Sequence, residues 1–271
     1  MIQNNIRLIV SDLDGTLLNS KEKLNPDFFP ILDEIRRRDI VFVVATGRQY
    51  HNVLEHFEPV KENIYFITEN GGLMIYRDEH LLVVDIPQTS IFELIQTAKE
   101  RDNAFTVLCG EKSAYIESSQ SELFSLAKRY YNKLEIVDDF HTIQNDRFLK
   151  LSFYDPSDVR ETLYPTFTHF EEEFRVVVSG ANWLDISSKK ATKGAALEII
   201  QQKLNISPAQ TMVFGDFMND YEMMLKGEHS YAMKNAIDEI KQVSRYIAPS
   251  NDDNGVLQVL NNLLFNIPVT Q

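Results

Sequence analysis

Short, largely apolar runs alternate along this chain with stretches of helical periodicity, and this alternation constrains the fold more than any other feature. The runs lie at residues 8–10, 41–44, 64–67 and 211–214, with weaker copies at 231–233 and 246–248. Continuous apolar runs of this length are typical of strands that are covered on both faces. Because such strands alternate with helices, we expect an α/β fold with a Rossmann-like, doubly wound parallel sheet and right-handed crossovers.

Turn residues predict where two of the helices begin or end. Asn25-Pro26 combines a favoured N-cap residue with proline at the first helical position, which predicts a helix from there to about residue 38. Gly227 predicts the C-cap of a later helix, because glycine readily adopts the left-handed conformation that closes many helices.

The middle of the chain has a different pattern, in which strands lie close together. An apolar stripe at Ile91, Leu94, Ile95 and Ala98 predicts one helix. Strands are predicted at 105–108, 113–117, 148–154 and 174–179, and helical segments at 121–131 and 157–172. This pattern indicates an antiparallel sheet with helices on one face. We therefore expect an α+β domain, residues 86–185, inserted into a core made of residues 1–85 and 186–271.

Composition argues against several classes of partner. The chain has 271 residues, with 27 Lys and Arg against 40 Asp and Glu, which gives a formal net charge of −13. An acidic chain gains no counterion-release attraction for nucleic acid and is repelled by anionic membrane surfaces. We therefore expect neither nucleic acid nor a membrane among its partners.

Other features predict a cytoplasmic location. Residues 1–5 show no basic region followed by a long apolar stretch, so no signal peptide is expected. The longest apolar run, residues 40–45, is far shorter than the ~18–20 residues of a membrane helix. Cys109 is the single cysteine and cannot form an internal disulfide. We expect a monomer or a weak homo-oligomer in a reducing compartment.

Carboxylates follow two of the predicted strands. Asp12-Leu13-Asp14-Gly15-Thr16 follows the first strand, and Gly215-Asp216-Phe217-Met218-Asn219-Asp220 follows the strand at 211–214. The carboxyl ends of parallel strands form the edge at which open α/β sheets bind ligands. Each motif alone also fits an ordinary turn or helix cap. An EF-hand is disfavoured because its other ligands and late glutamate are missing.

Two further motifs suit an anion. Thr46-Gly47-Arg48 follows the strand at 41–45, and its threonine hydroxyl and glycine N–H can cradle a phosphate. Lys193-Gly194 opens the helix after the middle region, where a lysine can hold a phosphoryl oxygen. Four acidic groups at one sheet edge repel each other unless a hard cation is present, and oxygen ligands favour Mg²⁺. Together the four motifs predict a magnesium-dependent phosphoryl-transfer site.

With these motifs the chain resembles the haloacid dehalogenase superfamily of phosphatases, in particular the Cof-type branch with a large inserted cap, and within it the bacterial sugar-phosphate phosphatases. Glu69-Asn70-Gly71-Gly72, Ala232-Met233-Lys234-Asn235-Ala236 and Asn254-Gly255-Val256 also carry the resemblance. The resemblance implies that residues 86–185 are a cap that selects the substrate. It also implies hydrolysis of small phosphorylated metabolites, such as sugar phosphates, through an aspartyl-phosphate. Lys234 departs from the family's usual glycine, which raises the question of whether its φ angle is positive.

The resemblance further implies a role for each site residue. Asp12 attacks phosphorus and binds Mg²⁺, and Asp14 protonates the leaving group, activates water and binds Mg²⁺ through its carbonyl. Asp216 completes the metal ligands, and Asp220 supports them from outside the ligand set. The phosphoryl oxygens are held by the backbone N–H of Leu13 and by Thr46, Gly47, Lys193 and Asn219.

Three alternatives to a phosphatase remain. A phosphosugar mutase on the same fold would return the phosphoryl group to the sugar. A phospho-acceptor signalling domain would be phosphorylated without turnover, but the inserted domain and the second carboxylate, Asp14, argue against it. A catalytically silent binding protein is disfavoured by the intact set of Asp12, Asp14, Lys193 and Asp216.

Overall fold

The computed structural model describes residues 5–100 and 104–266, and the chain forms two compact units. The first unit contains residues up to 47, 54–81 and those from 192 onward, and the second contains 48–53 and 82–191. Four of the five residues that bear on the predicted absence of a signal peptide lie outside the described residues. No helix within the described ranges is long and apolar enough to cross a bilayer.

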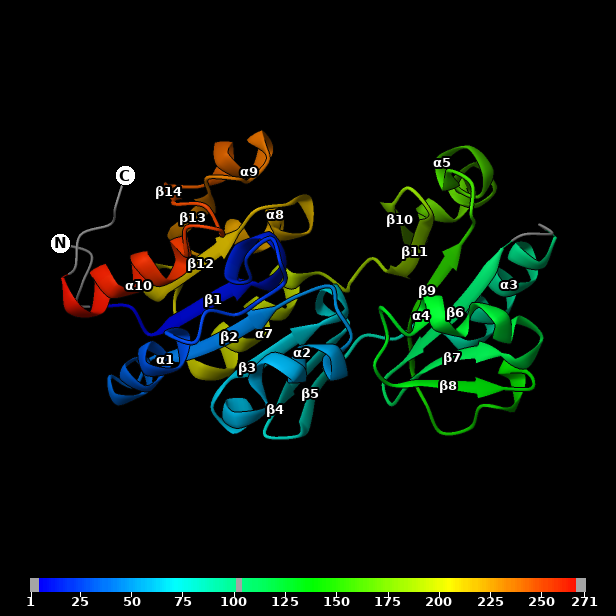
Figure 1. Cartoon of the computed structure of the whole chain (residues 1–271), viewed down its shortest axis with the longest axis horizontal. Coiled ribbons are helices and arrows are strands. Elements are labelled where there is room, and N and C mark those ends of the chain that lie inside the picture. Colours follow the sequence, from blue (N-terminus) through cyan, green and yellow to red (C-terminus); the bar gives the residue numbers. More distant parts are fainter. Residues whose placement is uncertain (1–4, 101–103, 267–271) are drawn as a thin grey trace. The chain divides into compact units, whose positions relative to one another are not determined.

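The first unit is built on an eight-stranded sheet with the strand order β14-β13-β12-β1-β2-β3-β4-β5 (Figure 1). The strands are β1 (Leu8–Asp12), β2 (Val41–Ala45), β3 (Tyr65–Thr68), β4 (Leu73–Tyr76), β5 (Glu79–Val83), β12 (Thr211–Gly215), β13 (His229–Met233) and β14 (Tyr246–Ala248). The six from β14 to β3 are parallel, and β4 pairs antiparallel with β3. This arrangement confirms the predicted Rossmann-like parallel core.

Strand order reverses between β1 and β12, and this reversal fixes where the helices lie. The chain moves outward from β1 to β3 in one direction and from β12 to β14 in the other. Right-handed crossovers then put the connecting helices on opposite faces. The helices are α1 (Phe28–Arg37), α2 (Tyr50–Phe57), α7 (Lys193–Leu204), α8 (Tyr221–Met224), α9 (Asp238–Val243) and α10 (Gly255–Phe265). In agreement, α1 packs against α10, and α8 packs against α7 and α9.

The second unit contains a six-stranded sheet with the order β10-β11-β9-β6-β7-β8. Its strands are β6 (Phe105–Gly110), β7 (Ala114–Glu117), β8 (Leu134–Val137), β9 (Phe148–Tyr154), β10 (Phe174–Gly180) and β11 (Trp183–Ser188). Neighbours pair antiparallel except β7 and β8, which are parallel. The predicted stripe on α3 (Gln88–Lys99) packs into one buried core with α5 (Val159–Thr162), α6 (Tyr164–Phe167) and one face of the sheet.

Several local predictions were wrong. The Asn25 side chain accepts a hydrogen bond from the Asp27 backbone, so Asn25-Pro26 forms a turn and α1 begins later, at Phe28. Gly227 does not have a positive φ and is no C-cap; a Cβ there would lie 2.9 Å from Val213 Cγ1, so close packing requires glycine. The helical segment predicted at 157–172 is divided into α5, α6 and a 3₁₀ turn, with proline in the first turn of α6.

The eight-stranded sheet has two strands that the sequence did not predict, β4 and β5, and the six-stranded sheet has two more, β8 and β11. The first two residues of β5 are exposed and the other three are only partly buried, so β5 lacks the burial of the inner strands. The question raised by Lys234 is also answered, because Lys234 is not among the described non-glycine residues with a positive φ.

Candidate active site

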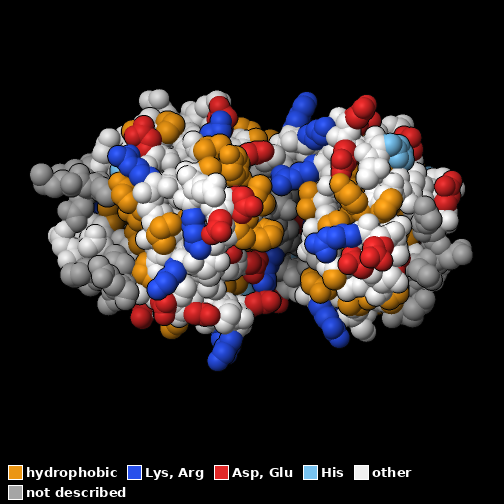
Figure 2. Space-filling model, turned by 90° about the horizontal axis from the view of Figure 1, so that it is seen from above, with side chains coloured by type: hydrophobic (Ala, Val, Ile, Leu, Met, Phe, Trp, Pro, Cys, Tyr) orange, Lys and Arg blue, Asp and Glu red, His pale blue; other side chains and the backbone are white. Residues whose placement is uncertain are grey.

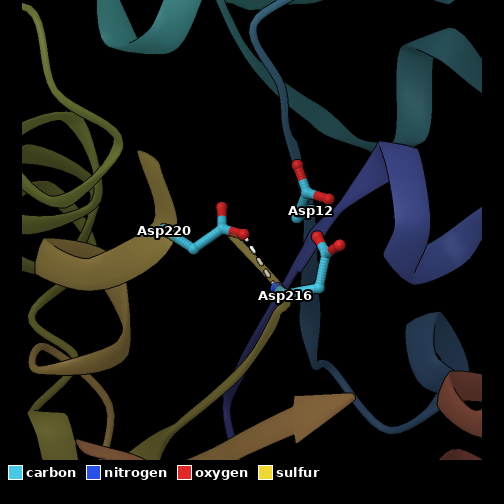
Figure 3. A group of neighbouring side chains, drawn as sticks. All are labelled: Asp12, Asp216 and Asp220. Atoms are coloured by element: carbon cyan, nitrogen blue, oxygen red, sulfur yellow. Dashed lines mark hydrogen bonds between the residues drawn. The ribbon is translucent and has the colours of Figure 1, made fainter. Parts of the chain in front are cut away.

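The site is assembled at the point where strand order reverses in the first unit. Asp12 is the last residue of β1, and Asp216 directly follows the neighbouring parallel strand β12. Asp220 lies at the end of the short turn that follows Asp216. One carboxylate oxygen from each of these three residues lies within 4.8 Å of the other two (Figure 3). The sheet thus brings together acidic residues that are some 200 positions apart in the sequence.

Lys193 is the positive partner of these carboxylates. It is the first residue of α7, and its side chain is completely buried. Its Nζ donates to Asp12 Oδ1 at 2.5 Å and to Asp220 Oδ1 at 2.7 Å. The preceding residue, Thr192, caps α7 by accepting a hydrogen bond from the Ala195 backbone, which fixes where the helix begins. The start of α7 therefore places the Lys193 ammonium at the edge of the sheet.

The charge balance of the group perturbs its pKa values. Burial raises the pKa of Asp12 well above its ordinary value, and the Asp220 charge raises it further, while Lys193 opposes this shift. Burial likewise raises the pKa of Asp216 to about 6, with the Asp220 charge adding to the shift and the Thr16 hydrogen bond opposing it. Burial alone would lower the pKa of Lys193, but Asp12 and Asp220 outweigh it and raise this pKa. The site therefore has excess negative charge.

Asp220 is held by backbone donors on the loop that carries Asp216. Its Oδ2 accepts from the backbone N–H groups of Asp216 at 2.9 Å and of Phe217 at 3.2 Å. A Cβ at Gly215 would lie 2.7 Å from the Asp220 Cβ, so glycine makes room for this arrangement. Since Lys193 occupies its other oxygen, Asp220 is suited to fixing the loop.

Asp12 and Asp216 suit a hard cation. Asp12 Oδ2 is buried and accepts no hydrogen bond within the described part of the chain. Asp216 is partly buried and faces Asp12 at the point where strand order reverses. Two carboxylates with an orphaned oxygen, in a group with excess negative charge, fit a divalent cation that prefers oxygen ligands. The residues present therefore agree with the metal that the sequence predicts.

The loop after β1 separates Asp14 from the group of three carboxylates. Asp14 is exposed, and its side chain is not part of the acidic group. Gly15 has φ +75°, and a Cβ there would lie 2.3 Å from Asp216 Oδ2. Asn235 donates to the Gly15 carbonyl at 2.8 Å and so holds the turn. The structure thus places the two carboxylates of the first motif in different surroundings, one buried and one in contact with water.

The predicted phosphate-binding residues all lie in the first unit. Leu13 is buried at the start of the turn after β1, and Thr46 and Gly47 follow the adjacent strand β2. Asn219 lies between Asp216 and Asp220, and its Nδ2 donates to Asn70 Oδ1 at 3.0 Å. Leu13, Thr46, Gly47 and Asn219 therefore come from loops after the neighbouring strands β1, β2 and β12, while Lys193 comes from the start of α7.

Two residues at the site were not assigned by sequence reasoning. Thr16 donates from its hydroxyl to Asp216 Oδ1 at 3.1 Å, and Asn235 braces the Gly15 turn. Both lie in motifs that carried the family resemblance, but neither has a partner nearby in the sequence.

Figure 2 shows acidic side chains interspersed with Lys and Arg over the visible face of each unit. Charge compensation at the site therefore depends on local residues such as Lys193.

Known proteins resemble this chain over almost its full length. The sequence model of the family described as haloacid dehalogenase-like hydrolase matches residues 9–260. The chain is 28% identical to the 5-amino-6-(5-phospho-D-ribitylamino)uracil phosphatase YbjI of Escherichia coli, with 96% of each chain covered. It is 27% identical to the phosphatase YwpJ of Bacillus subtilis, with 96% of this chain and 100% of the relative covered.

A solved structure agrees with these matches. The crystal structure of SMU.1108c from Streptococcus mutans has 32% sequence identity and a TM-score of 0.83. The match covers 96% of this chain and 99% of the other. The similarity therefore includes the inserted second unit as well as the sheet that carries the acidic group.

Proposed function

The chain belongs to the haloacid dehalogenase-like hydrolases and is a phosphatase, and from this premise we propose that it hydrolyses small phosphorylated metabolites through an aspartyl-phosphate on Asp12, with Mg²⁺ as cofactor. The observation that carries the proposal is the environment of Asp12. One of its oxygens is bound by the buried ammonium of Lys193, and the other is buried without a hydrogen-bond partner among the described residues.

The first half-reaction moves the phosphoryl group to the protein. An oxygen of Asp12 forms a bond to phosphorus while the bond from phosphorus to the leaving oxygen breaks. Asp14, which is exposed and is not part of the buried group, gives its proton to that oxygen. Two carboxylates can divide these roles because their surroundings differ.

The second half-reaction returns Asp12 to its starting state. Asp14, now ionised, accepts a proton from water, whose oxygen bonds to phosphorus as the bond to Asp12 breaks. Inorganic phosphate leaves, and Asp14 is again protonated. The cycle consumes one ester and one water and releases one alcohol and one phosphate.

Neutralisation of charge is the main requirement for phosphoryl transfer. Asp12, Asp216 and the backbone carbonyl of Asp14 would hold Mg²⁺, which supplies positive charge when bound. Lys193 supplies a second positive charge and keeps the Asp12 carboxylate in place. The oxygens of the phosphoryl group are bound by Lys193 and by the groups already predicted, which are the Leu13 N–H, Thr46, Gly47 and Asn219.

Sugar phosphates and related polyol phosphates are the proposed substrate class, and the cap at residues 86–185 is proposed to select among them. The Escherichia coli relative is named for a substrate whose phosphate lies on a ribityl chain, which supports this class. A cytoplasmic location and a monomeric or weakly associated state remain predictions from the sequence.

A substrate screen tests the proposal. The purified chain is incubated with Mg²⁺ and a panel of phosphorylated metabolites, and both phosphate and isomerised sugar are measured. We expect phosphate release from sugar or polyol phosphates without formation of an isomer. Isomer formation as the main reaction would identify a mutase instead, and phosphorylation without turnover would identify a signalling domain.

A further inference from the structure

The turn between β3 and β4 has an unusual backbone. Glu69, Asn70 and Gly71 are three consecutive residues with positive φ angles, of 50°, 55° and 100°. Residues other than glycine seldom adopt this conformation, because their side chains crowd the backbone there. A strained segment of this kind persists where its surroundings determine it. The family resemblance assigned no role to Asn70, although Asn70 is the central residue of this strained turn.

Asn70 lies between two loops of the proposed phosphate site. Its backbone N–H donates to the Thr46 carbonyl at 3.0 Å. Its side-chain Oδ1 accepts from Asn219 Nδ2 at 3.0 Å. A Cβ at Gly47 would lie only 3.0 Å from the same Oδ1, so Asn70 packs directly on the Gly47 backbone. Asn70 thus connects the loop after β2 with the loop after β12, on opposite sides of β1.

The next residue of the turn, Gly71, packs against a third loop as closely as Asn70 packs against the first two. A Cβ at Gly71 would lie 2.2 Å from the carbonyl oxygen of Thr192, the residue before Lys193. The left-handed backbone of 69–71 is therefore what lets Asn70 enter the space between the loops. All of these residues belong to the first unit.

We propose that Asn70 is a positioning residue for phosphate binding, and this proposal rests on the proposed function. Its side-chain oxygen orients the Asn219 amide, and its backbone fixes the loop that carries Thr46 and Gly47. A side-chain amide nitrogen has two hydrogens, so one bond to Asn70 leaves the other for a phosphoryl oxygen. The bridge holds both loops in place before the substrate binds, which lowers the ordering cost of binding.

The test uses Asn70→Gly, because glycine tolerates the left-handed backbone while lacking the amide. The matched control is Asn205→Gly. Asn205 also has a positive φ, of 52°, but it caps the far end of α7 from Lys193. Asn219→Ala and the double variant Asn70→Gly/Asn219→Ala complete a cycle. Inhibition by inorganic phosphate, kcat/KM for esters with different leaving groups, and thermal stability are measured for each.

We expect Asn70→Gly to weaken inhibition by phosphate about 5–10-fold, the effect of one hydrogen bond. Its kcat/KM falls by a similar factor for every ester, because the phosphoryl group is common to all of them. The double variant is no worse than the poorer single variant, since Asn70 acts through Asn219. Asn205→Gly leaves phosphate inhibition unchanged while altering thermal stability to a similar extent.

Two results would overturn the positioning role while the phosphatase assignment stands. One is unchanged phosphate inhibition in Asn70→Gly, and the other is a double variant whose loss equals the product of the single losses. A wild-type protein that neither binds phosphate nor hydrolyses any ester would overturn the proposed function together with this role.

Discussion

Lys193 faces more negative charge than it can neutralise. Its ammonium contacts Asp12 and Asp220, and Asp216 adds a third carboxylate to the group. When all three are ionised, two negative charges remain uncompensated, and buried like charges disfavour one another. Burial raises the pKa values of Asp12 and Asp216, and the Asp220 charge raises both further. At the scale of single residues, the site therefore favours positive charge in addition to that of Lys193.

The role of Asp12 is tested by Asp12→Asn. An amide of the same size keeps the packing but cannot attack phosphorus, so we expect turnover to fall at least about 10³-fold. Phosphate release and circular dichroism are measured together to separate chemistry from folding. A folded variant that keeps substantial activity would mean that water attacks the substrate directly and that Asp12 only binds metal.

At the scale of elements, the turn after β1 shapes the proposed metal site. Gly15→Ala would place a Cβ 2.3 Å from Asp216 Oδ2 at a backbone with φ +75°. We expect the Asp216 carboxylate to be displaced and the affinity for Mg²⁺ to fall roughly 10–100-fold, as for other changes next to a metal ligand. Calorimetric titration with Mg²⁺ measures this directly.

The control for that variant is Gly110→Ala in the second unit. A Cβ there would also meet a carboxylate, at 2.2 Å from Asp146 Oδ2. It crowds an acidic residue in the same way but away from the three-carboxylate group, so Mg²⁺ affinity is expected to stay unchanged. Equal losses of affinity in both variants would contradict the assignment of Asp216 as a ligand.

The sequence predicted those elements whose physical cause is local. Strands such as β1 and β12 are buried throughout, so they appear as continuous apolar runs. The half-exposed β5 begins with two exposed polar residues and was not predicted, and Gly227 is required by a contact with Val213 that no local pattern reveals. The same holds at the site. Motifs located the carboxylates, but the bond from Thr16 to Asp216 and the bridge through Asn70 join residues about 200 and 150 positions apart.

At the scale of the whole molecule, a cation bound by the folded state alone should stabilise the protein. A Mg²⁺ concentration a hundredfold above Kd stabilises the folded state by about 2.7 kcal/mol. We expect Tm to rise on adding Mg²⁺ to chelated protein and turnover to return with it. Asp216→Asn should lose most of this shift, whereas Asp185→Asn, in the second unit, should keep it. Full activity in excess chelator would contradict the metal dependence.

The covalent intermediate is the central claim, and Asp14→Asn tests it most directly. A sugar alkoxide needs a proton in order to leave, whereas p-nitrophenolate does not. A general acid typically contributes ~10²–10⁴-fold. The first step should therefore be slowed far more for a sugar phosphate than for p-nitrophenyl phosphate. The second step should be slow for both, because water still needs a base.

The measurement is rapid mixing of Asp14→Asn with p-nitrophenyl phosphate, followed by acid quench and peptide mapping. We predict a burst of about one equivalent of nitrophenolate per site, then slow turnover, with the phosphoryl group found on Asp12. Linear product formation without a burst, together with no phosphoryl group on Asp12, would contradict the aspartyl-phosphate mechanism.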